Sequence, residues 1–256
     1  MATKKAQTAQ AKKPLYIIAI TIGLIAWVWL CILGADFISR FTFRWFIQTF
    51  KINPGTIIQS LYSTIVYLLA IAIMLGIPAL LRKKFKILEK HPLLEKPTRE
   101  EMGLKGLPTW TDILLSPIGF VAQLVLSSAL MSLFSHLFSW FNANEAQNVG
   151  YSDLYTAGDK ILAFVIVAII APVAEEIIFR GFLYGRLRKH LNFPVSALLV
   201  SLLFAVLHGQ WNVGVNVFVF SLILCGFREI TGTIYSGILV HIIKNAVAFY
   251  LLFIAV

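Results

Sequence analysis

The hydrophobic pattern of this chain consists of long apolar runs that are separated by shorter polar stretches. A helix needs roughly 20 apolar residues to cross a hydrocarbon core of about 30 Å. Candidate runs lie at about residues 15–34, 56–81, 113–141, 161–185, 194–208, 213–228 and 232–256. The pattern therefore predicts an all-α protein, a polytopic transmembrane helix bundle of about seven membrane helices, within a range of roughly six to eight.

The composition also indicates a membrane protein. Of the 256 residues, 59% are hydrophobic and 13% are charged, and the mean hydropathy is +0.82, far outside the range of soluble globular domains. The net charge of +10 would suit a nucleic-acid partner, but the basic residues flank the apolar runs, where the positive-inside rule explains them. We therefore expect membrane lipid, and no nucleic acid, as a partner. Cys31 and Cys225 both lie in apolar runs and predict neither a disulfide framework nor a thiolate metal cluster.

The charges of the loops predict one orientation. Loop 82–112 carries eight Lys and Arg residues, whereas loop 142–160 carries three acidic residues and one Lys. A Lys-rich N-terminus in the cytoplasm puts 82–112 inside and 142–160 outside. We expect an integral, multi-pass membrane protein with a cytoplasmic N-terminus, and the short, compact chain favours a prokaryotic plasma membrane. Arg40, Arg44 and Lys51 fall on the outer side, where we expect an interfacial amphipathic segment.

Three segments are expected along the chain. Residues 1–13 form a disordered basic tail, residues 14–112 a transmembrane hairpin with a cytoplasmic loop, and residues 113–256 a back part with five apolar runs. Ionisable residues away from the ends of the runs are concentrated in the back part. Polar groups are costly in lipid and usually face a protein interior or a cavity, so the back part is expected to hold an intramembrane polar cavity with a functional site.

Side chains from three runs are predicted to meet at one depth. Counted at about 1.5 Å per residue, Glu175, His208 and His241 lie about 16, 21 and 14 Å from the predicted cytoplasmic ends of their runs. All three depths fall near the middle of a core of about 30 Å. Asn245 follows His241 by four residues and shares its helix face. A carboxylate, two imidazoles and an amide at one level predict a site.

The two adjacent glutamates are expected to have different roles. Residues four apart share a helix face, so Glu176 and Arg180 are placed to form a structural ion pair. Glu175 points about 100 degrees away from Glu176 and has no obvious local partner. An unpaired carboxylate suits a general base or acid. The alternative for Glu175 is an ordinary hydrogen bond within the helix bundle.

These side-chain types permit two kinds of chemistry. A carboxylate with a nearby His can deprotonate water, while an imidazole and an amide can donate to the oxyanion of a tetrahedral intermediate, which together describes peptide hydrolysis. Glu175, His208 and His241 are also candidate ligands of a divalent metal such as zinc, because two His and one carboxylate form a catalytic zinc arrangement. The H-E-x-x-H motif of soluble zinc proteases is absent from the sequence, so the cofactor stays open.

At these positions the chain resembles the CAAX protease and bacteriocin-processing family of intramembrane endopeptidases, also called the Abi family. The family signature is a double glutamate followed by arginine, then Phe-x-x-x-His, then His-x-x-x-Asn or His-x-x-x-Asp. All three motifs occur in order, as Glu175, Glu176 and Arg180, then Phe204 and His208, then His241 and Asn245. The resemblance covers about residues 160–250.

The resemblance implies that residues 113–256 form a catalytic transmembrane domain. By the family pattern Glu175 activates water with help from His208, and His241 and Asn245 stabilise the oxyanion. We place Glu176 in the same candidate catalytic set. Family members are usually described as metalloproteases, and a metal-free glutamate mechanism has also been proposed. Eukaryotic relatives remove the last three residues of prenylated CAAX proteins, and prokaryotic relatives are linked to peptide maturation, bacteriocin immunity and membrane signalling.

The function expected from these observations is intramembrane hydrolysis of a peptide bond in a membrane-associated peptide or protein. One alternative is a non-catalytic membrane partner, such as an immunity protein that sequesters a peptide. A further alternative is an ion-coupled transporter, since intramembrane Glu and His also occur there. The chain shows no duplicated halves with matching broken helices, which argues against a transporter.

Overall fold

The computed structural model describes residues 14–85, 91–147, 149–151 and 154–255. The predicted disordered tail, residues 1–13, lies outside the described residues. So do Lys86, Lys90 and Asp153, whose charges contributed to the predicted orientation.

Within these described ranges the protein consists of helices joined by loops and contains no strand, which confirms the all-α prediction. The front part forms α1 (Pro14–Phe50) and α2 (Thr56–Lys84), and a short 3-10 turn, η2 (Pro92–Leu94), follows. The back part consists of α3 (Trp110–Leu137), a continuous rod, α7 (Phe193–Val206), α8 (Trp211–Thr231) and α9 (Tyr235–Phe253). The rod is built from α4 (Ala157–Phe164), η3 (Val165–Ile170), α5 (Ala171–Glu176), η4 (Ile177–Leu183) and α6 (Tyr184–Leu187).

Six of these helices are long and apolar enough to cross a membrane, with the rod Ala157–Leu187 counted as one. This number lies within the predicted range. The exception is the run predicted at 194–208, because α7 has only 14 residues. At about 1.5 Å per residue it reaches about 21 Å, short of a core of about 30 Å.

Helix α1 is much longer than its predicted run. It has 37 residues and extends to Phe50, so Arg40 and Arg44 lie on the same continuous helix as the apolar run. At about 1.5 Å per residue its length is about 55 Å, more than the hydrocarbon core requires. Its last turns are tied to α2 through Asp36, which pairs with Arg40 at 2.9 Å and accepts a hydrogen bond from the hydroxyl of Tyr62.

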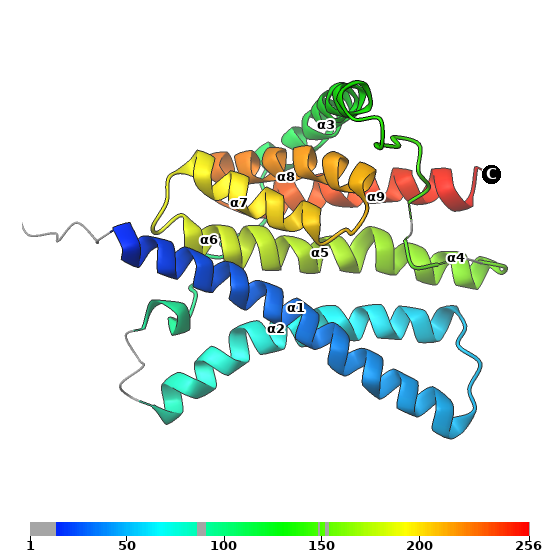
Figure 1. Ribbon diagram of the computed structural model, residues 1–256, viewed down its shortest axis with the longest axis horizontal. Coiled ribbons are helices and arrows are strands. Elements are labelled where there is room, and N and C mark those ends of the chain that lie inside the picture. The colour runs from blue at the N-terminus through cyan, green and yellow to red at the C-terminus, as the bar shows by residue number, and fades with distance from the viewer. Residues whose placement is uncertain (1–13, 86–90, 148, 152–153, 256) are drawn as a thin grey trace, which may run out of the picture.

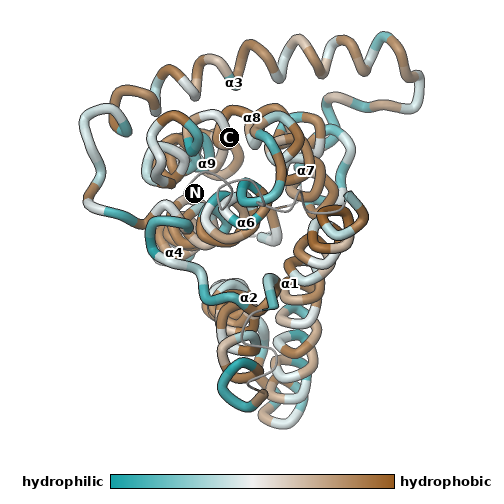
Figure 2. Tube along the Cα trace, turned by 90° about the vertical axis from the view of Figure 1, so that its left-hand side faces the viewer, coloured by the Kyte–Doolittle hydropathy of each residue, from teal (hydrophilic) through white to brown (hydrophobic). Residues whose placement is uncertain are grey.

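The helices are arranged in layers around the rod (Figure 1). The hairpin of α1 and α2 lies on one side of the rod, and α7, α8 and α9 lie on the other. Helix α3 crosses over α8 and α9 on the far side from the hairpin (Figure 2). The rod contacts both α2 and α9, so side chains on it can be reached from two sides.

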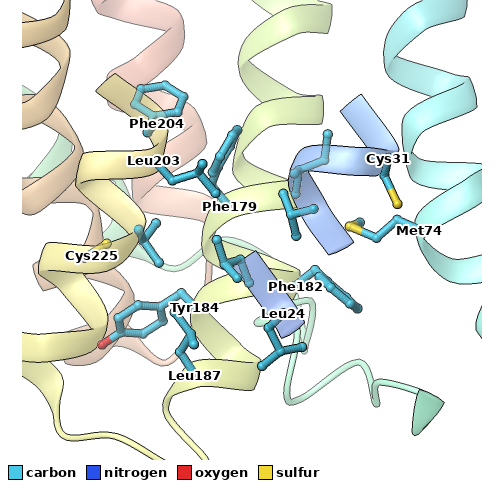
Figure 3. Packing of buried hydrophobic residues seen from close by; sticks show 14 of the residues in the cluster. Leu24, Cys31, Met74, Phe179, Phe182, Tyr184, Leu187, Leu203, Phe204 and Cys225 are labelled. Atoms are coloured by element: carbon cyan, nitrogen blue, oxygen red, sulfur yellow. The ribbon is translucent and has the colours of Figure 1, made fainter. Parts of the chain in front are cut away.

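The main apolar core lies where α1, α2, the rod and α7 meet (Figure 3). Leu24 and Met74 from the hairpin are 1% exposed and belong to the same apolar cluster as Phe182 of the rod and Leu203 of α7. Core packing therefore joins the hairpin to the back part of the chain.

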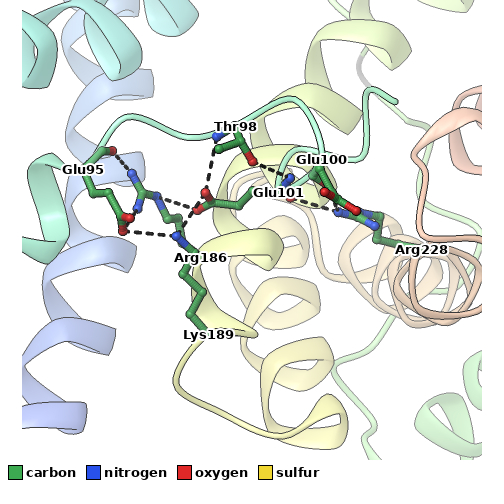
Figure 4. Close-up of polar contacts among 7 residues, drawn as sticks. All are labelled: Glu95, Thr98, Glu100, Glu101, Arg186, Lys189 and Arg228. Carbon is green, nitrogen blue, oxygen red and sulfur yellow. Dashed lines mark hydrogen bonds and ion pairs between the residues drawn. The ribbon is translucent and has the colours of Figure 1, made fainter. Parts of the chain in front are cut away.

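The polar segment after α2 is folded onto the end of the rod by a charged network (Figure 4). Arg186 is buried and pairs with Glu95 at 3.0 Å and with Glu101 at 3.2 Å. Lys189 pairs with the same two glutamates, at 3.1 and 3.0 Å. The hydrogen bond from Lys189 and the nearby Arg186 charge hold the pKa of Glu95 below its usual value. Arg228 of α8 donates to the backbone carbonyl of Glu101 at 2.9 Å.

Replacing Arg186 with Ala is expected to loosen segment 91–109 from the rod. Lys189 still pairs with both glutamates, so we expect the loss to stay below the roughly 3 to 5 kcal/mol of a fully broken buried pair. Limited proteolysis in detergent should cut 91–109 several-fold faster than in the wild type, by about tenfold for a loss of 1.4 kcal/mol. Lys105→Ala is the control, because Lys105 forms an exposed pair with Glu100 and should not change the rate. Equal cleavage of Arg186→Ala and wild type would contradict the role of this network.

Candidate active site

The rod changes its helical hydrogen bonding on both sides of the two glutamates. Short π-helical segments, η3 and η4, flank α5 and are frequent at functional sites. In η3 the N–H of Ala171 donates to the carbonyl of Ile166, five residues back. The next carbonyl, that of Val167, would face the nitrogen of Pro172, which carries no hydrogen. The sequence of the rod therefore leaves one backbone acceptor without a partner inside the helix.

Asn245 supplies the missing donor. Its Nδ2 donates to the carbonyl of Val167 at 2.9 Å and so connects α9 to the rod. A buried carbonyl without a partner is costly, which gives this hydrogen bond a structural purpose. The amide of Asn245 has a second N–H that this bond does not use.

Glu176 is completely buried and held by two partners. Its Oε1 accepts from Nη1 of Arg180 at 2.8 Å and lies 3.0 Å from Nδ1 of His241. The Arg180 guanidinium also stacks on the ring of Phe204, at 4.6 Å from the ring centre. Gly237 of α9 permits the close approach, because a Cβ there would lie 2.9 Å from Oε2 of Glu176. The ion pair therefore ties the rod to α7 and α9.

Glu175 faces a different environment from Glu176. Its side chain is 16% exposed, its Oε1 accepts from the hydroxyl of Tyr67 at 2.6 Å, and its Oε2 lies 3.6 Å from Nε2 of His241. His241, 3% exposed, thus stands between the two carboxylates, with one ring nitrogen toward each. The two glutamates contact different side chains because adjacent helical residues point about 100 degrees apart.

His208 lies just beyond the end of α7. Its Nδ1 is 2.8 Å from the carbonyl of Phe204, and a carbonyl can only accept. Nδ1 therefore carries the hydrogen, and in the neutral ring Nε2 keeps a lone pair. This lone pair makes His208 a proton acceptor.

Glu175 and His208 line the same cavity, which has a volume of about 240 Å³. Its remaining walls are mostly apolar, and Tyr67, Ile32 and Ala70 contribute from the hairpin. The structure thus brings Glu175, Glu176, Arg180 and His241 into contact, places His208 on the same cavity as Glu175, and holds Asn245 on the rod. Their catalytic roles remain predictions.

The sequence did not point to Tyr67 or Gly237. Tyr67 lies 108 positions before Glu175, inside the apolar run of α2. The one available signal was its hydroxyl, since a buried Tyr usually finds a hydrogen-bond partner. Gly237 carried no such signal, because its importance depends on the side chain that it faces.

Glu175, His208 and His241, the candidate metal ligands, are not arranged around a common point where a metal ion could bind. Within the part of the chain that the structure describes, no group of three or more His, Cys, Asp or Glu side chains is arranged to hold a metal ion. Nδ1 of His208 is engaged by the Phe204 carbonyl and Nδ1 of His241 faces Glu176, which leaves Nε2 of each ring as the nitrogen that a metal could contact. We derive no chemical step through a metal.

Part of the chain matches a family of known proteins. Residues 157–247 match the family model described as type II CAAX prenyl endopeptidase Rce1-like. This segment is Rce1-like. The resemblance inferred from the three motifs is thereby confirmed over these residues. No curated protein and no solved structure matches the chain.

The Rce1-like segment contains all the site residues that the sequence indicated, from Glu175 to Asn245. The match supports a CAAX protease-like enzyme. Together with the six apolar helices it supports an integral, multi-pass membrane protein. Tyr67 and the α1–α2 hairpin lie outside the Rce1-like segment.

Replacing Gly237 with Ala is expected to destabilise the Rce1-like segment. The new Cβ would force Glu176 away from Arg180 and His241, and overpacking of this kind costs about 1 to 3 kcal/mol. Gly226→Ala in α8 is the matched control, because nothing lies within 4 Å of a Cβ there. It should leave stability equal or slightly higher, since Ala favours helix over Gly by about 1 kcal/mol. Thermal unfolding in detergent measures both, and equal Tm values for the two variants would contradict this account.

Proposed function

We propose that this protein is an intramembrane endopeptidase that hydrolyses a peptide bond of a membrane-associated peptide or protein, with water activated by Glu175. The observation that carries the proposal is the cavity shared by Glu175 and His208 inside the helix bundle. The carboxylate of Glu175 and the free lone pair of His208 both face this cavity. Each can take a proton from a water or a substrate that is held there.

The proposed chemistry begins with Glu175. Its carboxylate takes a proton from water, and the resulting hydroxide attacks the peptide carbonyl carbon. His208 orients this water through the Nε2 lone pair. The proton on Glu175 then passes to the leaving nitrogen as the tetrahedral intermediate collapses, so Glu175 serves as base and then as acid.

His241 and Asn245 are proposed to stabilise the oxyanion. Asn245 has the N–H that Val167 does not use, and His241 can donate from Nε2 when it is protonated. Glu176 is completely buried, and we propose that it acts by orienting His241 through the 3.0 Å contact with Nδ1. Arg180 in turn holds Glu176, which keeps this chain of contacts in place.

A prenylated C-terminal peptide of the CAAX type is the proposed substrate class. The description of the matched family names prenyl endopeptidases, and the cavity walls beside Glu175 are apolar, including Ile32, Phe179 and Leu207. Such a substrate reaches the cavity from the membrane. In this proposal segment 91–109, which follows the basic last turn of α2 with Arg82, Lys83 and Lys84, faces the cytoplasm of a prokaryotic plasma membrane.

Replacing Glu175 with Gln is expected to abolish hydrolysis while the fold is kept. The assay is cleavage of a farnesylated, internally quenched CAAX peptide by purified protein in liposomes. Loss of the base should reduce the rate by about 10² to 10⁴. Glu229→Gln is the matched control, because Glu229 pairs with Arg188 at 2.7 Å, away from the cavity. An active Glu175→Gln variant, or a wild type that cleaves neither this peptide nor any membrane protein in cells, would contradict the proposal.

Chelation is expected to leave this activity within about twofold of its initial value, because the site side chains are not arranged as a ligand set. The measurement is the peptide assay before and after dialysis against a strong chelator, with elemental analysis of the same protein. A soluble zinc protease in the same buffer is the positive control for chelation. Stoichiometric zinc together with loss of activity on its removal, and recovery on its return, would show that a metal takes part.

A further inference from the structure

We propose that Tyr67 is a positioning residue for Glu175, so that the α1–α2 hairpin completes the active site of the Rce1-like segment. This inference rests on the proposed function. It concerns a residue outside the matched range 157–247, in the part of the chain that the sequence predicted as a transmembrane hairpin without a stated role.

The contact itself is short and specific. The hydroxyl of Tyr67 donates to Oε1 of Glu175 at 2.6 Å, which is typical of a hydrogen bond to a carboxylate. Both side chains line the same cavity of about 240 Å³. The bond therefore acts where water and substrate would be held, and not at the periphery of the bundle.

Packing alone does not account for a tyrosine at this position. The neighbours of Tyr67 on the cavity wall of α2 are Val66 and Ala70, and both are apolar. A Phe would pack equally well there, and a hydroxyl among apolar groups costs free energy unless it is bonded. Glu175 supplies the acceptor that offsets this cost.

The bond makes the two oxygens of Glu175 unequal. Oε1 is engaged by Tyr67, whereas Oε2 lies 3.6 Å from Nε2 of His241, its one ion-pair contact among the residues that the structure describes. That separation is longer than a hydrogen bond, so His241 does not fix the carboxylate. Tyr67 therefore restrains Glu175 from turning fully onto His241, and Oε2 remains available to take a proton from water.

The partners of Glu176 differ from those of Glu175 in where they lie along the chain. Glu176 is held by Arg180 and His241 from within the Rce1-like segment itself. Glu175 receives its short hydrogen bond from α2 instead. In this proposal Glu175 is oriented when the hairpin is docked on the rod, where Met74 of α2 and Phe182 of the rod share one apolar cluster.

Tyr67→Phe tests the proposal in the farnesylated CAAX peptide assay. We expect kcat to fall by about 10- to 100-fold, as for loss of one hydrogen bond to a charged group, with KM within about threefold of the wild type. Thermal stability in detergent should be close to that of the wild type. Tyr62→Phe is the matched control, because it removes from the same helix a hydroxyl that also bonds a carboxylate, Asp36, outside the cavity. It should keep the wild-type kcat.

Each outcome decides for or against Tyr67. A Tyr67→Phe enzyme with kcat within about twofold of the wild type would overturn the inference, as would a defect confined to KM or to stability. Should this variant fail to fold, 3-fluorotyrosine at position 67 keeps the shape and makes the hydroxyl more acidic. A changed pH profile of kcat then supports the inference, and an unchanged profile overturns it. A wild type that cleaves nothing, or an active Glu175→Gln variant, would instead refute the proposed function.

Discussion

The buried contact among Glu176, Arg180 and His241 is the interaction on which the rest of the site depends. Charged groups inside a bundle cost several kcal/mol unless their partners are close and well aligned. Here Glu176 pairs with Arg180 of the same helix and with His241 of α9, and Phe204 of α7 lies under the guanidinium. Three elements thus meet at this pair, and moving α7 or α9 would remove one of its contacts.

The two adjacent glutamates have different surroundings although they lie on the same helix. Glu176 is inaccessible and takes part in the packing, whereas Glu175 reaches a cavity, and its Oε2 lies 3.6 Å from His241. His241 therefore lies between the buried carboxylate and the one that we propose as the base. This arrangement gives each of the two neighbouring carboxylates its own contacts. It also explains why their neighbour across the interface is a glycine, since a larger side chain would occupy the space of Glu176.

The sequence predicted the helical class and the meeting of the motif residues, because both follow from local periodicity and run length. Hydrophobicity alone did not show that α7 is too short to span or that α1 continues to Phe50. The π segments were also missed, since they depend on how Pro172 is accommodated within the packed rod. Tyr67 could not be found from the motifs, because its partner lies far away in sequence and the bond exists only after the hairpin has docked.

Pro172 and Asn245 illustrate a further consequence of the packing. The proline removes a donor from the rod, and the amide on α9 replaces it. The two positions, 73 residues apart in the chain, are therefore energetically coupled. Losing the amide alone strands a carbonyl, whereas with an ordinary residue at 172 the rod would no longer need Asn245 as a donor to its backbone. The same amide would then have both of its N–H groups free for a bound peptide.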